Sequence, residues 1–203
     1  MLQVEEALAE VAEIAAERYR FVAIDVETAS TDTGSICQIG LACVQDDRVA
    51  RVVTVLIDPG CAFDAMNIRI HGITAEHVVG MPRFAGFLDV AGAFLDRHLL
   101  IQHSSFDSRA FARATEACGR APQALAWHDS VLVARRAWPE FKGNGGHGLS
   151  HLKGALGLDF RHHDAGEDAR AAAEVVLRAE ARMGLPFAEI LGQPAARRAR
   201  QGG

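Results

Sequence analysis

The chain has 203 residues, 49% of them hydrophobic and 23% charged, with a formal net charge of −5 at pH 7. This length suits one well-buried domain, and this composition excludes a disordered or fibrous protein. The longest apolar runs, such as residues 52–57, fall far short of the roughly 18 residues of a membrane span, and the acidic N-terminus differs from a secretory signal. We therefore expect a cytoplasmic protein with no membrane partner.

The negative charge and the four cysteines narrow the classes of function further. An acidic protein is poorly suited to coating duplex nucleic acid, although local fields matter more than the net charge. The cysteines lack the paired spacing that metal clusters and disulfide frameworks use. Cys37 and Cys43 lie in an apolar run, so we expect them to be buried and reduced.

Residues 2–18 place apolar side chains among acids and arginines at helical spacing, which predicts an amphipathic helix ahead of the main domain. Such helices mostly cover a core, so we expect a packing role, with homodimerisation as the alternative. We expect an N-terminal helix over residues 1–19, one domain over residues 20–184 and a C-terminal tail over residues 185–203.

The domain begins with the pattern of a sheet and then alternates between helical and extended patterns. An apolar run at residues 21–24 predicts a buried strand, and residues 36–44 and 49–57 predict a hairpin. Three strands followed by alternating strands and helices predict an α/β fold, a mixed sheet with helices packed on its faces. The remaining predicted strands cover residues 98–102 and 125–127, and the helices cover residues 84–97, 107–118, 130–137, 147–156 and 165–183.

Two carboxylates end the first predicted strand, at Asp25 and Glu27. Side chains two apart on a strand point to the same face, so both acids should face one point of the sheet while Val26 faces the packing. A buried strand tolerates charges only when they are paired or bind a metal. The pair is half of a site for a hard cation, although two acids at a solvated strand end would be ordinary surface charge.

Three further residues, taken together with this pair of acids, indicate what the pair does. Asp107 follows a predicted strand and opens a helix, where capping the helix would explain it equally well. Asp168 lies in an early turn of the last predicted helix, where it could simply balance a nearby arginine. His163 carries the side chain best suited to accept a proton near neutral pH, although tandem histidines can be mere surface. Each residue has an ordinary explanation alone, but their order and settings together predict a catalytic centre.

The arrangement resembles the DEDDh branch of the DnaQ-like 3′→5′ exonucleases, a family that includes the proofreading subunit of bacterial DNA polymerase III and ribonuclease T. The family motifs are matched by FVAIDVET at residues 21–28, by Phe106-Asp107, and by His163 with Asp168 ahead of an alanine-rich helix. The resemblance covers about residues 20–183. Two family landmarks, HGIT and DT, are matched by residues 71–74 and by Asp129-Ser130.

The resemblance implies a ribonuclease H-like fold, with a mixed five-stranded sheet, its first strand central, and helices on both faces. It implies two Mg²⁺ or Mn²⁺ ions about 3.5–4 Å apart, with Asp25 bridging them. His163 would take the proton of an attacking water, and the leaving 3′ oxygen would be stabilised by a metal ion. The product would be nucleoside monophosphates from single-stranded 3′ ends, with DNA favoured. The implied metal ligands are Asp25, Glu27, Asp107 and Asp168.

The resemblance also implies where the substrate lies. Thr28 should contact the terminal nucleotide, Ile70 should lie against its base, and His71 should lie nearby. The family commonly has His-Asn where this chain has Gln102-His103. This departure leaves the metal ligands intact, so it bears on substrate preference rather than on catalysis.

Other functions stay open at this point. The 2′-hydroxyl distinguishes RNA from DNA, and no residue in the sequence indicates whether it is recognised. An RNA 3′-end exoribonuclease is therefore the first alternative. A non-catalytic module that binds strand ends is the second, although such a module would usually lack one of the five catalytic residue types, and all are present. No run in the tail resembles a clamp-binding peptide, so neither a polymerase nor a clamp is indicated as a partner, and a stand-alone enzyme is favoured.

Overall fold

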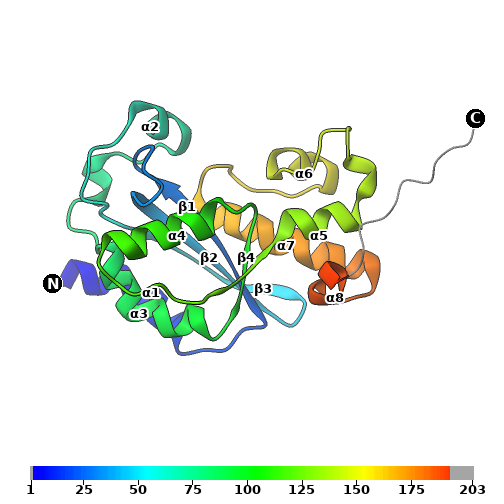
Figure 1. Ribbon diagram of the computed structural model, residues 1–203, viewed down its shortest axis with the longest axis horizontal. Coiled ribbons are helices and arrows are strands. Elements are labelled where there is room, and N and C mark those ends of the chain that lie inside the picture. Colours follow the sequence, from blue (N-terminus) through cyan, green and yellow to red (C-terminus); the bar gives the residue numbers. More distant parts are fainter. Residues whose placement is uncertain (1, 193–203) are drawn as a thin grey trace, which may run out of the picture.

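The computed structural model describes residues 2–192. Its centre is a five-stranded sheet in the order β3-β2-β1-β4-β5 (Figure 1). β1 pairs antiparallel with β2 and parallel with β4, so the sheet is mixed and its first strand is central, as predicted. The strands are β1 (Phe21–Thr28), β2 (Ile36–Gln45), β3 (Arg48–Leu56), β4 (Leu99–Gln102) and β5 (Ala126–Asp129).

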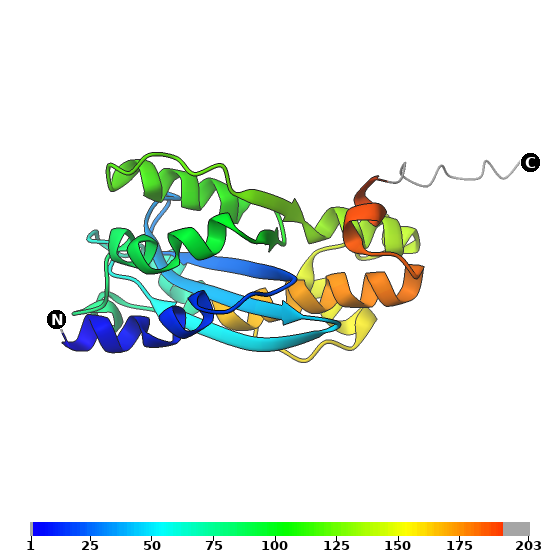
Figure 2. The same cartoon turned by 90° about the horizontal axis from the view of Figure 1, so that it is seen from below.

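Helices cover both faces of this sheet (Figures 1 and 2). One core lies between the sheet and α1 (Leu2–Ala15), α3 (Phe84–Asp96) and α4 (Phe106–Ala117). The core on the other face contains α5 (Ser130–Ala137), α6 (Leu149–Leu156), α7 (Ala165–Met183) and α8 (Phe187–Gly192). Three short elements complete the described chain: α2 (Ala65–His71), η1 (Ala75–Val78) and η2 (Pro139–Phe141). None of the helices in residues 2–192 combines the length and apolar content that crossing a membrane requires.

The N-terminal helix α1 packs against its own domain, which confirms the packing role. Its apolar side chains Leu8, Val11 and Ile14 are buried in the core that also contains α3. An ion pair of 2.9 Å joins Glu13 to Arg51 of β3. Figure 2 shows α1, in blue, lying near the cyan strand β3.

Two helices, α2 and α8, are not among the predicted elements. α2 has no buried residue, so it lacks the apolar periodicity that marks a helix. α8 is six residues long and lies inside the segment predicted to be a tail, yet Phe187 and Ile190 are buried. Phe187 contacts Phe21 edge to face, with ring centroids 5.5 Å apart, and this contact fixes α8 to β1. The rest of the predicted tail, residues 193–203, lies outside the described residues.

Candidate active site

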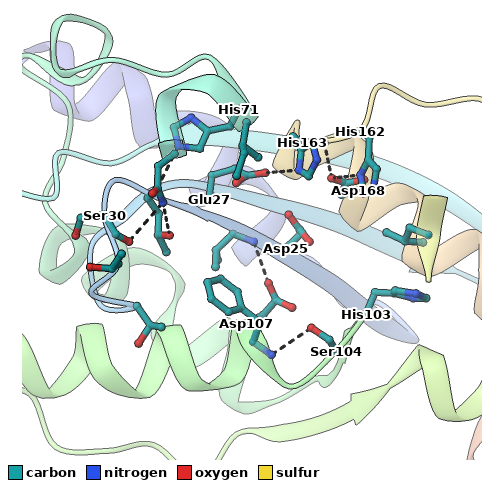
Figure 3. Close-up of a pocket in the computed structure, with 18 residues that line it drawn as sticks. Asp25, Glu27, Ser30, His71, His103, Ser104, Asp107, His162, His163 and Asp168 are labelled. Carbon is teal, nitrogen blue, oxygen red and sulfur yellow. Dashed lines mark hydrogen bonds and ion pairs between the residues drawn. The ribbon is translucent and has the colours of Figure 1, made fainter. Parts of the chain in front are cut away.

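β1 changes character along the face that it shares with α7. Phe21 and Ala23 belong to the core that contains α7, whereas the next two residues on this face are Asp25 and Glu27. Both acids line a cavity of about 510 Å³ (Figure 3), and Val26 between them is packed in the opposite core. The prediction that the two acids share one face is confirmed.

Two glycines allow the N-terminus of α7 to lie directly on the sheet. Gly40 of β2 is the residue paired with Asp25 of β1, and a Cβ atom on it would come within 2.0 Å of the carbonyl oxygen of Ala165. A Cβ atom on Gly166 would come equally close, 2.0 Å, to a side-chain oxygen of β3. Because neither glycine carries a side chain, the first turn of α7 brings Asp168 to the acids of β1.

Hydrogen bonds hold the start of α7 in this position. The backbone N–H of Ala165 donates to Oε1 of Gln38 on β2, at 3.0 Å. The side chain of Asp164 caps the helix by accepting from the backbone N–H of Glu167, at 3.3 Å. The result is a compact group of carboxylates, with one oxygen from each lying within 4.8 Å of the others. Its members are Asp25, Glu27 and Asp168.

We expect Gly40→Ala to lower both stability and nuclease activity. The added methyl group overlaps the backbone of α7, and overpacking of this kind costs about 1–3 kcal/mol of folding free energy. Since α7 relieves the overlap only by moving away, Asp168 should separate from β1 and the rate should fall even well below the melting temperature. Gly86→Ala is the matched control, because the nearest atom to a Cβ there is 3.9 Å away. Full activity in the Gly40 variant would contradict the need for this close approach.

Asp107 reaches the same cavity from α4. It lies in the first turn of that helix, and its Oδ1 accepts a hydrogen bond of 3.1 Å from the backbone N–H of Val26. This bond ties the start of α4 to β1, so helix capping alone does not explain the residue. Asp107 lines the cavity but stands outside the compact group of three carboxylates.

Burial raises the pKa of all four acids, and the charges of neighbouring acids raise it further at Asp25, Glu27 and Asp107. Burial is the largest cause at Asp25, whose pKa is raised well above its usual value, and the charges of Asp107 and Asp168 add to it. Burial, followed by the charge of Asp168, raises the pKa of Glu27 to about 8, and burial raises that of Asp107 to about 7. Burial also raises the pKa of Asp168, against a lowering by His162. Such a group favours any cation that can take the place of its protons.

We expect the metal-free protein to lose stability as the pH rises from about 4.5 to about 8. The pKa of Glu27 is raised from 4.5 to about 8, so its proton favours the folded state fully below pH 4.5. That contribution is lost as the pH rises through the folded-state value. Mg²⁺ competes with these protons, so it should raise the melting temperature more at about pH 8 than at about pH 5.5. Calorimetry with and without Mg²⁺ checks this, and a larger increase at the lower pH would contradict it.

His163 stands at the mouth of the cavity in an unusual backbone conformation. Its φ of 65° lies in the left-handed region, which residues other than glycine seldom adopt. The backbone N–H donates to Oδ2 of Asp168 at 2.8 Å, which helps to hold this conformation. Its Nδ1 lies 4.0 Å from Oε1 of Glu27, and its side chain is 47% exposed. The imidazole is therefore next to the acids and open to water.

His162 is a partner of Asp168 that the sequence analysis leaves unassigned. Its Nδ1 lies 2.8 Å and 3.1 Å from the two carboxylate oxygens of Asp168. Its ring stacks on that of His163 with centroids 4.3 Å apart and an angle of 4° between the planes (Figure 3). His162 thus orients a predicted metal ligand and supports the predicted base, and the tandem histidines are the one signal of this in the sequence.

The three predicted substrate residues lie together beside the acids. Ile70 and Thr28 both line the cavity; Ile70 is 47% exposed, whereas Thr28 is buried. The backbone N–H of Ile73 donates to Nδ1 of His71, so the other ring nitrogen carries the proton and donates to the carbonyl of Thr28 at 3.1 Å. Asn67, in the helix that the sequence analysis missed, donates to the same carbonyl at 2.7 Å. Contact of these residues with a nucleotide stays a prediction.

The residues that depart from the family pattern lie at the end of β4, where His103 lines the cavity and Gln102 does not. Gln102 accepts from the backbone N–H of Ser108 at 2.9 Å and so fixes the start of α4. His103 is partly buried, and burial of its ring lowers its pKa to about 4; the ring lies 2.8 Å from the hydroxyl of Ser130. Its Nε2 donates to the carbonyl of His147 at 2.9 Å, so it joins β4, α5 and the glycine-rich loop before α6.

Comparisons with known proteins agree with this geometry. The family model described as Exonuclease, RNase_T, matches residues 22–176. The PolC-type DNA polymerase III of Thermotoga petrophila is 28% identical over 166 residues, which covers 80% of this chain and 12% of that polymerase. The chain therefore spans about an eighth of the length of that curated relative.

Solved structures of exonucleases share the fold. Exonuclease X, in a complex with 5′ overhanging duplex DNA, superposes with a TM-score of 0.66 at 20% identity, covering 85% of this chain and 98% of that one. The nuclease domain of 3′hExo, a DEDDh family member bound to rAMP, gives a TM-score of 0.65 at 16% identity, covering 83% and 94%. These likenesses confirm the predicted fold class.

Proposed function

The chain belongs to the exonuclease family, and on that premise we propose that it releases nucleoside 5′-monophosphates from the 3′ ends of single-stranded DNA. Membership of the family makes it a nuclease, a hydrolase of phosphodiester bonds. The observation that carries the finer proposal is the cavity itself, in which four acids with raised pKa values meet an exposed histidine.

The donor set fits divalent cations. Carboxylate oxygens are the ligands that Mg²⁺ and Mn²⁺ prefer, and four buried or partly buried acids in one cavity repel one another unless protons or cations compensate them. Two such ions would supply positive charge at the scissile phosphate and a bound water of lowered pKa. The residues that would hold them are Asp25, Glu27, Asp107 and Asp168.

The protein's own groups position the substrate and move the proton. Thr28, Ile70 and His71 hold the terminal nucleotide against the acids. The imidazole of His163 accepts the proton of the attacking water as the new O–P bond forms. The bond between phosphorus and the 3′ oxygen breaks, that oxygen takes up a proton from solvent, and the shortened strand leaves with a free 3′-hydroxyl. His162 keeps the carboxylate of Asp168 oriented and the ring of His163 in place.

DNA is the favoured substrate because the curated relative is a DNA polymerase and Exonuclease X was solved with DNA. RNA is the second candidate, since 3′hExo was solved with rAMP. Three oligonucleotides of one sequence separate these options: all-deoxy, all-ribo, and deoxy with a single 3′-terminal ribonucleotide. We expect the all-deoxy strand to be shortened fastest. Faster cleavage of the all-ribo strand would support the exoribonuclease, and cleavage of none of them would support the binding module.

A further inference from the structure

A second hollow of about 550 Å³ adjoins the catalytic cavity. We call it the upstream groove. It lies between α2 and the segment that leads into α7, and it shares four lining residues with the catalytic cavity: Ile70, His71, His162 and His163. Figure 3 shows His71 and His163 along one edge of the catalytic cavity, with Glu27 between them. The two hollows therefore meet along a ridge that contains the predicted base.

The upstream groove carries the opposite charge to the catalytic cavity. Arg69, His77 and Arg161 line it, and all three are exposed. Arg161 pairs with Asp164, the one acid in the lining of this groove among residues 2–192, and its side chain stays 80% exposed. No carboxylate within those residues forms an ion pair with Arg69. This is a local excess of positive charge on a chain whose net charge is −5.

The floor of the upstream groove consists of aliphatic side chains and one side-chain amide. Leu56 and Ile73 supply aliphatic surface, and Gln38 supplies an amide side chain. Ile70, at the shared ridge, is among the exposed large hydrophobic residues of the protein. A floor of this kind accepts the face of any nucleobase, while arginines at the rim suit phosphate oxygens.

We propose that the upstream groove binds the strand on the 5′ side of the scissile bond, with Arg69 and Arg161 on its phosphates. This rests on the proposed function. The bond that is cut joins the terminal nucleotide to the next one, and its phosphate must lie at the acids. If the terminal nucleotide fills the catalytic cavity, the next nucleotide can leave across the ridge of Ile70 and His163, which borders both hollows. The upstream groove is the hollow on the other side of that ridge.

Two substrates separate the groove from the catalytic cavity. The p-nitrophenyl ester of thymidine 5′-monophosphate contains the terminal nucleotide and replaces the rest of the strand by p-nitrophenol. A deoxyoligonucleotide extends through the groove. The double variant Arg69→Ala with Arg161→Ala should lower kcat/KM on the oligonucleotide about tenfold or more, because each arginine loses a charge-assisted phosphate contact. Its kcat/KM on the ester should stay within about twofold of the unmodified protein.

Salt dependence gives a second readout. Each phosphate contact that is lost should make the dependence of log KM on log salt shallower by about 0.7 for a single strand. Arg120→Ala is the matched control, since Arg120 is an exposed arginine with one ion pair to Asp89, outside both hollows. It should leave the rate on both substrates and the salt dependence unchanged.

The outcomes distinguish the groove from the function on which it rests. Arg161 pairs with Asp164, the residue that caps α7, so the double variant can lose stability. In that case the single variant Arg69→Ala, which leaves this ion pair intact, is the test of the groove. A selective loss on the oligonucleotide supports the proposal. An unchanged rate on the oligonucleotide, or an equal loss on both substrates, overturns the groove while the nuclease function stands. Failure of the unmodified protein to cleave either substrate overturns the function and the groove together.

Discussion

Asp25→Asn should lower the rate of 3′-end hydrolysis by about 10³-fold or more, since a metal ion contributes several kcal/mol of charge stabilisation in the transition state. The same change should raise the melting temperature of the metal-free protein. Burial and the neighbouring Asp107 and Asp168 raise the pKa of Asp25, so ionising it near neutral pH costs folding free energy that a neutral amide avoids. A substitution that lowers the rate of hydrolysis while raising the melting temperature identifies a residue that serves catalysis at a cost in folding stability.

The matched control for this change is Asp89→Asn, which removes an exposed acid from α3 that pairs with Arg120. It should leave the rate unchanged and lower stability slightly. Rates under single-turnover conditions and melting curves in EDTA give both quantities. An Asp25 variant that keeps its rate would remove Asp25 from the metal site, whereas a loss of rate with a lowered metal-free melting temperature would point to misfolding instead.

His163→Asn should slow the chemical step by about 10²–10⁴-fold, the contribution usual for a positioned base. Asparagine is the suitable replacement because it tolerates the left-handed backbone conformation that His163 adopts, with φ of 65°. The backbone N–H that donates to Asp168 is also kept. The loss should therefore reflect the missing imidazole rather than a rearranged loop.

His162→Asn tests which of the tandem histidines accepts the proton. His162 contacts Asp168 directly, so its loss should weaken metal binding and lower the rate, but the rate should still depend on pH as in the unmodified protein. In the His163 variant the pH dependence of the chemical step should change. Identical pH–rate profiles with and without His163 would argue against its role as the base.

The sequence predicts those parts of the site that depend on local periodicity. Asp25 and Glu27 share a face because a strand repeats every two residues, and β1 continues through both acids to Thr28. The predicted helices at residues 130–137 and 165–183 match α5 and α7 to the residue, because capping residues and glycine or proline stops flank them.

The parts that escape prediction depend on contacts between distant segments. Gly40 has no local signal of its purpose, since the carbonyl that it avoids belongs to Ala165. His103 gains its role only when His147, 44 residues away in the sequence, is brought beside it. α2 has no buried residue to give it a pattern, and with it the contact of Asn67 stays hidden.

The most direct test of the central claim is digestion of a 5′-labelled single-stranded DNA oligonucleotide with Mg²⁺, with EDTA, and with the Asp25→Asn variant. We predict a ladder that shortens from the 3′ end one nucleotide at a time with Mg²⁺, and an intact strand in the other two reactions. A ladder that persists in EDTA or in the variant, or an intact strand with Mg²⁺, would contradict a metal-dependent 3′→5′ exonuclease centred on Asp25.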